Sequence, residues 1–432
     1  MKTYSFSELT ESRIAELTKR PSVDIHGVIE KITPIIDEVK NEGDAALQKY
    51  TEKFDGVAPD PISRPVRKPE EFNLPEDVTS AFDTAYRNIF KFHKAQYPSV
   101  LQVETMPGVS CSRIPRPIER VGLYIPGGTA VLPSSTLMLG TPAQIAGCKE
   151  IVLVTPPRPD GSISPEVEYC AHKTGATKIV LAGGAQAIAA LAYGTESVPK
   201  VDKIFGPGNQ FVTAAKMLLL NSDAMVGMDL PAGPSEVLVI ADETAEPSFV
   251  AADLLSQAEH GADSQVIMVG TGNFNYDELN RQINQQLELL PRHEVAAKAL
   301  QESFIVQTDS TAEAVSFSNR YAPEHLIINT KDPNAVCEEI THAGSVFLGQ
   351  WSPESVGDYA SGTNHTLPTY GFAKMYSGVS LADFFTFITA QNLTKEGLKS
   401  LAPAVTKMAE VEELEAHKRA VTIRLDENET KY

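Results

Sequence analysis

Hydrophobic residues near the start of the chain recur with the period of a helix. Between residues 23 and 54 the apolar positions are spaced three and four apart, at Val28, Ile32, Ile35, Ile36 and Val39. This spacing predicts an amphipathic helix with one buried face. The segment before it, 1–22, is expected to form a short arm. A connection rich in proline and charge over 57–75 leads to a second expected helix at about 75–95.

From about residue 110 onward, short apolar runs alternate with segments that have a helical pattern. The expected strands lie at 109–114, 121–125, 151–155, 178–182, 203–205, 235–241 and 265–269, and the expected helices at 165–173, 185–193, 211–220 and 247–260. Neighbouring parallel strands need a crossover, usually a helix, so this alternation predicts a doubly wound α/β fold. Residues 351–379 read as a long polar connection. The tail from 380 is expected to hold helices and a final strand at 421–425.

The composition narrows the class of protein but not its chemistry. The 432 residues include 56 acidic and 37 basic ones, a formal charge of -19, which argues against binding to nucleic acid. The chain lacks an apolar run of the roughly 20 residues that a membrane helix needs. Its start shows no basic region followed by an apolar stretch. We therefore expect a cytoplasmic protein that does not contact a membrane.

The cysteines are widely spaced and form no C-x-x-C pair; they are Cys111, Cys148, Cys170 and Cys337. This spacing argues against a zinc finger or a disulfide framework, so we expect reduced thiols. Lys149, beside Cys148, is a weak indication of a stabilised thiolate.

Gln257 and His260 lie three residues apart at the end of an expected helix, so they share one helix face. Their amide oxygen and imidazole nitrogen could bind a metal. The alternative is structural, because the helix dipole favours histidine near a C-terminus and Gly261 is a common C-cap. In the polar connection, Asp358 and His365 suit a metal or a small polar substrate, or else an Asx-type turn with a surface histidine.

Glu324 and His325 adjoin at the entrance of an expected strand, 326–329. Histidine exchanges protons near neutral pH and burial can tune a neighbouring carboxylate, so the pair suits acid–base work. A solvated pair at a strand end is the alternative. His417 follows Glu412 by five residues on a helix expected at 410–418, where a solvated amphipathic helix is the simpler interpretation.

Two glycine-rich turns, 183–186 (GGAQ) and 206–209 (GPGN), follow expected strands and open expected helices. Helix N-termini at such turns can bind phosphate groups. The second turn begins like the G-x-G-x-x-G fingerprint, but Phe211 stands where the third glycine should be, so the fingerprint is incomplete.

Together these segments resemble one family, the histidinol dehydrogenases. The resemblance covers essentially the whole chain and is weakest at 1–75 and 270–310. Its long motifs, which occur in the family's order, are VGLYIPGG (121–128), GGAQAIAA (183–190), GPGN (206–209), PAGPSEVLVIA (231–241), DLLSQAEHG (253–261), APEHLII (322–328), WSPESVGDYASGTNHTLP (351–368) and HKRAV (417–421).

The resemblance implies a role for each candidate residue. Glu324 and His325 match the catalytic pair. The zinc ligands match Gln257, His260, Asp358 and His417. The substrate contacts match Ser235, His365 and Glu412, together with His325 and the four zinc ligands. The NAD-contacting positions match Tyr124, Gln186 and Asn209.

The activity that the resemblance implies is oxidation of L-histidinol to L-histidine through L-histidinal, with reduction of two NAD⁺. These are the last two steps of histidine biosynthesis. His325 is the expected base for the alcohol, and Glu324 is expected to activate the water that hydrates the aldehyde. Zn²⁺ is expected to hold the imidazole and the amine of the substrate, a task that Mn²⁺ or Co²⁺ could also perform.

The implied fold has two Rossmann-like domains, one inserted in the other. The main domain is expected at 23–123 and 236–379, and the insert at 124–235. The arm, 1–22, and a C-terminal segment, 380–432, would embrace a second subunit. In the expected homodimer, Glu412 and His417 complete the partner's active site.

Two other interpretations compete with a dehydrogenase. A zinc hydrolase could use Glu324 or Glu259 as its base, and it would be active without NAD⁺. A catalytically inert relative is disfavoured, because every functional position carries the expected residue type. Oxidation of a different amino alcohol stays open.

Overall fold

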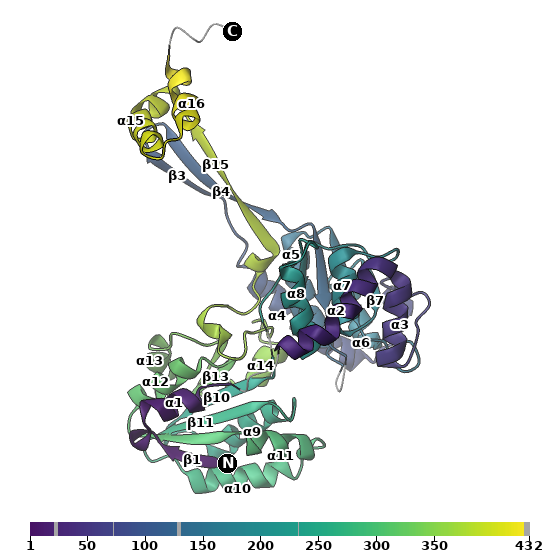
Figure 1. Ribbon diagram of the computed structural model, residues 1–432. Coiled ribbons are helices and arrows are strands. Elements are labelled where there is room, and N and C mark those ends of the chain that lie inside the picture. Colours follow the sequence, from purple (N-terminus) through teal and green to yellow (C-terminus); the bar gives the residue numbers. More distant parts are fainter. Residues whose placement is uncertain (21–24, 72, 128–130, 232, 427–432) are drawn as a thin grey trace. The chain divides into compact units, whose positions relative to one another are not determined.

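The computed structural model describes residues 1–20, 25–71, 73–127, 131–231 and 233–426. The chain divides into two units (Figure 1). The first unit comprises Met1–Gln96 and Ile118–Phe384, and the second comprises Tyr97–Pro117 and Phe385–Tyr432. No helix in the described ranges is both long and apolar enough to cross a bilayer.

One sheet of the first unit is formed almost entirely by the second half of the chain. Its strand order is β1-β12-β11-β10-β13-β14, and all neighbours are parallel. The strands are β1 (Lys2–Ser5), β10 (Glu236–Ala241), β11 (Gln265–Thr271), β12 (Phe304–Thr308), β13 (His325–Asn329) and β14 (Ser345–Leu348). The helices that accompany them are α1 (Glu11–Leu17), α9 (Pro247–Ala258), α10 (Tyr276–Leu287), α11 (His293–Gln301), α12 (Thr311–Tyr321), α13 (Pro333–Glu338) and α14 (Glu354–Tyr359).

Helices cover both faces of this sheet because its strands are apolar on both sides. Val237 and Val239 of β10 belong to a core with α9, α10 and α11. Leu238 and Ile240, which point the opposite way, belong to a core with α1, α12 and α13. Burial on both faces is what the continuous apolar run in this strand predicts.

The other sheet of the first unit has the order β2-β7-β6-β5-β8-β9, with β2 antiparallel to its neighbour. Its strands are β2 (Ser63–Pro65), β5 (Arg120–Tyr124), β6 (Glu150–Thr155), β7 (Lys178–Leu181), β8 (Lys203–Phe205) and β9 (Gly227–Met228). Its helices are α2 (Ile25–Glu42), α3 (Asp44–Asp55), α4 (Glu76–Lys94), α5 (Pro133–Ala146), α6 (Pro165–Lys173), α7 (Gly184–Tyr193) and α8 (Gln210–Leu220). Short 3₁₀ turns lie at Phe6–Glu8, Pro69–Glu71, Phe372–Lys374 and Leu381–Phe384.

The predicted pair of doubly wound sheets is confirmed. In chain order, the strands β10–β14 and β5–β9 each run 3-2-1-4-5 across their sheet, the Rossmann arrangement. The predicted buried face of the first long helix is also confirmed, since Val28, Ile32, Ile36 and Val39 of α2 are buried.

The expected domain boundaries need correction. Residues 23–123 were expected to join 236–379. Instead, α2 packs on α7 and α8 and its buried face lies in the core of the β5–β9 sheet, and Tyr97–Pro117 belong to the second unit. Strand β5 pairs with β6 and β8, so it also belongs there rather than to the main domain. The expected arm, 1–22, instead begins with an edge strand, β1, that pairs with β12.

The second unit is an antiparallel sheet with two helices. The strand order is β15 (Phe385–Leu393), β4 (Val109–Pro117) and β3 (Leu101–Met106), followed by α15 (Lys395–Val411) and α16 (Glu415–Leu425). The predicted final strand at 421–425 is wrong, since these residues lie in α16. The helix expected at 410–418 is interrupted, because Glu413 has a left-handed φ of 57°.

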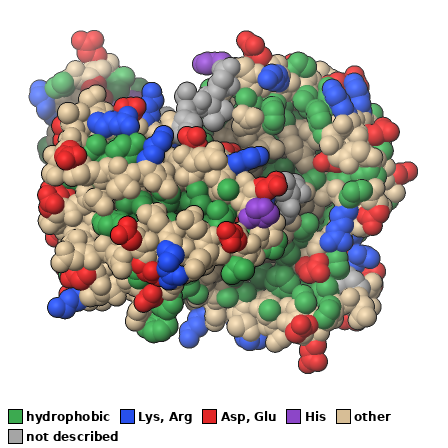
Figure 2. Space-filling model, turned by 90° about the horizontal axis from the view of Figure 1, so that it is seen from below, with side chains coloured by type: hydrophobic (Ala, Val, Ile, Leu, Met, Phe, Trp, Pro, Cys, Tyr) green, Lys and Arg blue, Asp and Glu red, His purple; other side chains and the backbone are tan. Residues whose placement is uncertain are grey.

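Charged side chains of both signs are interspersed over the face of the molecule that Figure 2 shows, with hydrophobic side chains exposed between them.

A fully buried carboxylate connects two elements inside the first unit. Glu168 of α6 accepts hydrogen bonds from the Arg64 side chain and from the Arg67 backbone N–H and side chain. These bonds tie the edge strand β2 to the helix layer. Burial raises the pKa of Glu168, but the two guanidinium groups outweigh it and lower the pKa to about 2.

The Glu168→Gln substitution should destabilise the first unit by roughly 2 kcal/mol at pH 7. A fully buried pair would lose about 3–5 kcal/mol, and both arginines here remain partly hydrated. Because the folded-state pKa is lowered, this contribution is present above the unfolded pKa of about 4.5 and is lost as the pH falls towards about 2. Urea unfolding at several pH values checks this, with the exposed Glu70→Gln as control. An equal loss in both variants would contradict it.

Candidate active site

The two residues of the expected catalytic pair lie at the amino end of a central strand. Glu324 and His325 are 7% and 3% exposed, and His325 begins β13 beside Val237 of β10. Ala322 adopts a left-handed φ of 53°, which ends α12 and turns the chain into the strand. Helix α9 follows β10 and runs back across the sheet, so its C-terminal end returns to the amino ends of the strands. This topology brings Gln257 towards the pair.

Backbone groups of Glu236 hold both members of the pair. The Glu236 N–H donates to Glu324 Oε2 at 2.8 Å. The Glu236 carbonyl lies 3.1 Å from His325 Nδ1, and His325 Nε2 lies 3.1 Å from Asp358 Oδ1. Both partners are acceptors, so each ring nitrogen carries a proton in these contacts: Nδ1–H donates to the carbonyl and Nε2–H donates to Asp358, and the imidazole is in its protonated form.

Burial and charge act in opposite directions on these groups. Burial lowers the pKa of His325, but the charge of Glu324 and the hydrogen bond to Asp358 outweigh it and raise the pKa well above its usual value. Burial raises the pKa of Asp358, but the hydrogen bond and charge of His325 outweigh it and lower the pKa. For Glu324, burial is stronger than the charge of His325, so its pKa is raised.

Arg20 holds the side chain of Glu236, whose backbone contacts Glu324 and His325. Its guanidinium donates to both carboxylate oxygens of Glu236 at 2.8 and 2.9 Å and lies 3.3 Å from the centre of the Tyr321 ring. Arg20 and Glu236 are buried. Arg20 of the expected arm therefore forms an ion pair with the residue whose backbone orients Glu324 and His325.

The helix α14 carries Asp358, which was expected in a loop. One turn earlier on the same helix lies Glu354, which is buried. The Gln257 amide N–H donates to Glu354 at 2.6 Å, and Ser256 Oγ donates to it at 2.9 Å. Burial raises the pKa of Glu354 to about 8. Sequence reasoning missed Glu354, because an acidic residue in the first turn of a short polar helix is a common surface feature.

The two histidines beside Asp358 are held differently. His365 Nδ1 lies 2.8 Å from the Asp358 carbonyl and its Nε2 lies 3.0 Å from Ser135 Oγ of α5. His260 follows α9, and burial lowers its pKa although Asp358 acts in the opposite direction. A neutral imidazole is the form that binds metals.

The donor set that the structure brings together fits a borderline divalent cation. Gln257, His260 and Asp358 offer amide oxygen, imidazole nitrogen and carboxylate oxygen. Within the described ranges, three or more His, Cys, Asp and Glu side chains are nowhere grouped to hold a metal by themselves. Ser235 lies directly before β10, where its carbonyl accepts from Gln265 N–H at 3.1 Å. Glu412 and His417 belong to the second unit, at the end of α15 and in α16.

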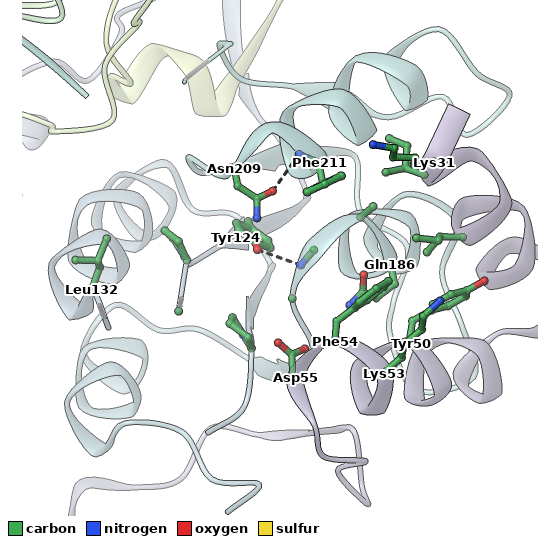
Figure 3. A pocket seen from close by; sticks show the side chains of 18 of the residues that line it. Lys31, Tyr50, Lys53, Phe54, Asp55, Tyr124, Leu132, Gln186, Asn209 and Phe211 are labelled. Carbon is green, nitrogen blue, oxygen red and sulfur yellow. Dashed lines mark hydrogen bonds between the residues drawn. The ribbon is translucent and has the colours of Figure 1, made fainter. Parts of the chain in front are cut away.

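The residues expected to contact NAD line a cavity of about 930 Å³ (Figure 3). Tyr124 ends β5, and its hydroxyl accepts from the Gly184 N–H at 3.1 Å. Asn209 caps α8, with its side chain accepting from two backbone N–H groups. Gln186 lies in the first turn of α7. These positions follow the carboxyl ends of strands, where open α/β sheets bind ligands.

The cavity also borders the cluster of residues around His325. His260 and Glu259, at the end of α9, line it together with Tyr359 of α14. A ligand in this cavity can therefore reach from the glycine turns to the residues around His325. Its volume is in the range of small-molecule and cofactor sites.

Comparison with known proteins identifies the family. The sequence profile described as histidinol dehydrogenase matches residues 18–425. The chain is 58% identical to the chloroplastic histidinol dehydrogenase of Arabidopsis thaliana, over 100% of this chain and 93% of that protein. It is 54% identical to the histidine biosynthesis trifunctional protein of Neurospora crassa, over 99% of this chain and 50% of that protein. The crystal structure of histidinol dehydrogenase from Elizabethkingia anophelis matches with a TM-score of 0.93 and 49% identity, over 98% of both chains. The chain belongs to the histidinol dehydrogenase family and is an oxidoreductase of histidine biosynthesis.

Proposed function

We propose that the protein oxidises L-histidinol to L-histidine through L-histidinal and reduces two NAD⁺ in succession. The observation that carries the proposal is the buried Glu324–His325 pair in a cluster that meets the large cavity through His260. The cavity has room for a cofactor, and the pair offers two groups for proton transfer.

In the first step, His325 accepts the proton of the alcohol as hydride leaves the carbon. Its Nδ1–H stays on the Glu236 carbonyl, which fixes the tautomer and directs Nε2 to the substrate. In this structure Nε2–H donates to Asp358. In the metal-bound enzyme we expect that carboxylate to bind the metal instead, which removes the contact that keeps Nε2 protonated and leaves this nitrogen free to accept the alcohol proton.

In the second step, Glu324 removes a proton from the water that adds to the aldehyde. Hydration gives the gem-diol, which transfers its hydride to the second NAD⁺ and its hydroxyl proton to His325, after His325 has released the first proton to solvent, and so becomes the carboxylate. The Glu236 N–H holds one Glu324 oxygen and so orients the carboxylate. The pKa of Glu324 is raised by burial, which makes its ionised form a stronger base.

We propose that Gln257, His260, Asp358 and His417 hold one Zn²⁺ per subunit, with Mn²⁺ or Co²⁺ as substitutes. Zinc would supply a point of attachment for the substrate imidazole and amine and so position the reacting carbon. We further propose a homodimer in which His417 and Glu412 come from the partner, with Ser235 and His365 beside the substrate.

The test is the number of NADH formed per L-histidinol consumed, before and after zinc removal. We expect two NADH per substrate, loss of activity on chelation and its return with Zn²⁺. Turnover without NAD⁺ would favour the zinc hydrolase. Absence of NADH with zinc bound and the dimer intact would point to another substrate and would overturn the roles of Glu324 and His325.

A cysteine-dependent mechanism is disfavoured by the state of the candidate thiol. Burial raises the pKa of Cys148 to about 12, so it is protonated at neutral pH and a poor nucleophile. We expect Cys148→Ser and Cys111→Ser to keep more than roughly half of wild-type turnover. Steady-state NADH formation checks this, and a folded but inactive Cys148→Ser variant would contradict the water mechanism.

The cellular compartment of the protein is either the cytoplasm or a plastid. The sequence led us to expect the cytoplasm, whereas the relatives from Arabidopsis thaliana and Oryza sativa are chloroplastic proteins. Fractionation of cells that express the native gene distinguishes a plastid from the cytoplasm.

A further inference from the structure

A carboxylate with an unused oxygen lines the large cavity. Asp55 is the last residue of α3, and it lies among the cavity residues labelled in Figure 3. Its Oδ2 atom is buried and has no hydrogen-bond partner within the described ranges. A buried acceptor of this kind is rare in folded proteins and calls for an explanation.

The position of Asp55 is unfavourable for stability. A negative charge at the C-terminal end of a helix opposes the helix dipole. The nearest basic side chain in sequence does not compensate, since Lys53 Nζ lies over the rings of Tyr50 and Phe54 instead. Burial raises the pKa of Asp55 without an opposing contribution. A residue kept against the stability of its own helix is typical of a binding site.

The place of Asp55 in the cavity indicates which part of a dinucleotide it would meet. His260 and Glu259 line the cavity from α9, next to the catalytic cluster, so the nicotinamide must lie on that side. The other half of the dinucleotide then extends towards the lining residues of α3. There Phe54, which is 52% exposed, offers a flat apolar face for adenine, and Asp55 follows it directly.

We propose that the Asp55 carboxylate accepts hydrogen bonds from the adenosine ribose hydroxyls and selects NAD⁺ over NADP⁺. This inference rests on the proposed use of a dinucleotide at this cavity. A ribose diol donates two hydrogen bonds that a carboxylate can accept, whereas a 2′-phosphate carries negative charge and repels it. In Rossmann sites the acidic residue usually follows a strand. Here it would come from a helix end.

The first test is isothermal titration of NAD⁺ and of NADP⁺ into the zinc-loaded protein. For Asp55→Asn we expect NAD⁺ binding to weaken by roughly tenfold, because hydrogen bonds to a charged group are lost. NADP⁺ binding should strengthen, since the repulsion disappears. The matched control is Glu52→Gln, an exposed acid-to-amide change on the same helix but outside the cavity lining, which should leave both affinities unchanged.

The second test removes the ligand's hydroxyl instead of the carboxylate. The wild-type protein should bind the 2′-deoxyadenosine analogue of NAD⁺ several-fold more weakly than NAD⁺ itself. The Asp55→Asn variant should bind the analogue and NAD⁺ with about the same affinity. The wild-type arm works even if the variant fails to fold. The melting temperature of ligand-free Asp55→Asn should equal or exceed that of wild type, whereas loss of a structural residue would lower it.

The outcomes separate this inference from the proposed function. Unchanged NAD⁺ affinity in Asp55→Asn, or equal wild-type affinity for NAD⁺ and its 2′-deoxy analogue, would overturn the role of Asp55 and leave NAD⁺-dependent oxidation standing. If the wild-type protein bound neither NAD⁺ nor NADP⁺, both the role of Asp55 and the proposed NAD⁺-dependent oxidation would be overturned.

Discussion

Replacing His325 by asparagine should stop NADH formation from both L-histidinol and L-histidinal. Asparagine can still donate to the Glu236 carbonyl, as His325 Nδ1 does at 3.1 Å, but it cannot accept a proton at neutral pH. General-base catalysis by a positioned side chain contributes about 10²–10⁴-fold, so a loss of that size is expected at each step.

The measurement is kcat for each substrate added separately, with dinucleotide binding as a second readout. The cavity is not lined by residue 325, so we expect NAD⁺ affinity to stay near that of wild type. The exposed His293→Asn, at the start of α11, is the control for a histidine-to-asparagine change outside the site. If His325→Asn kept more than about a tenth of wild-type turnover, another residue would have to be the base.

Local pattern predicted many of the elements, although α5, α10 and α11 were not predicted, and it could not assign elements to a sheet. The three- and four-residue spacing in α2 follows directly from helix geometry, and its buried face was predicted from it. Which sheet that face covers depends on pairing between distant strands, which periodicity does not encode. For this reason residues 23–96 were assigned to the wrong domain although helical segments were predicted there. The helical pattern over 23–54 also proved to be two helices, α2 and α3, which Gly43 separates.

The end of the chain shows where pattern itself misleads. Val421, Ile423 and Leu425 alternate with polar residues as in a half-buried strand, yet they lie in α16, which has no buried residue. With no buried face of its own to impose a period, the helix gives no amphipathic signal. The break before it depends on the left-handed conformation of Glu413, which glycine would have signalled but glutamate does not.

In the candidate site, too, some residues could be predicted from the sequence and others could not. His325 and Asp358 were found because long motifs resemble one family, and the structure adds that they contact each other. Arg20, Glu236 and Glu354 were missed. Each is a charged residue that is buried by contacts distant in sequence, so nothing in its immediate neighbours distinguishes it from a surface charge.

Replacing Glu324 by glutamine should separate the two half-reactions. Glutamine preserves the size of the side chain and can still accept from the Glu236 N–H, but it is not a base. Oxidation of L-histidinal should fall by about 10²-fold or more, because hydration of the aldehyde loses its base. Alcohol oxidation depends on His325 and should change by less than roughly tenfold.

Stoichiometry and trapping distinguish this outcome from a general loss of activity. The Glu324→Gln enzyme should form one NADH per L-histidinol instead of two, and a carbonyl reagent should capture L-histidinal from the reaction. The matched acid-to-amide control is Glu243→Gln, at an exposed position two residues after the end of β10. This variant should still form two NADH per L-histidinol. If Glu324→Gln oxidised L-histidinal at the wild-type rate, another residue would have to activate the water. Loss of both half-reactions with NAD⁺ binding intact would instead mean that Glu324 acts by holding His325, whose Nδ1 lies 3.6 Å from its carboxylate.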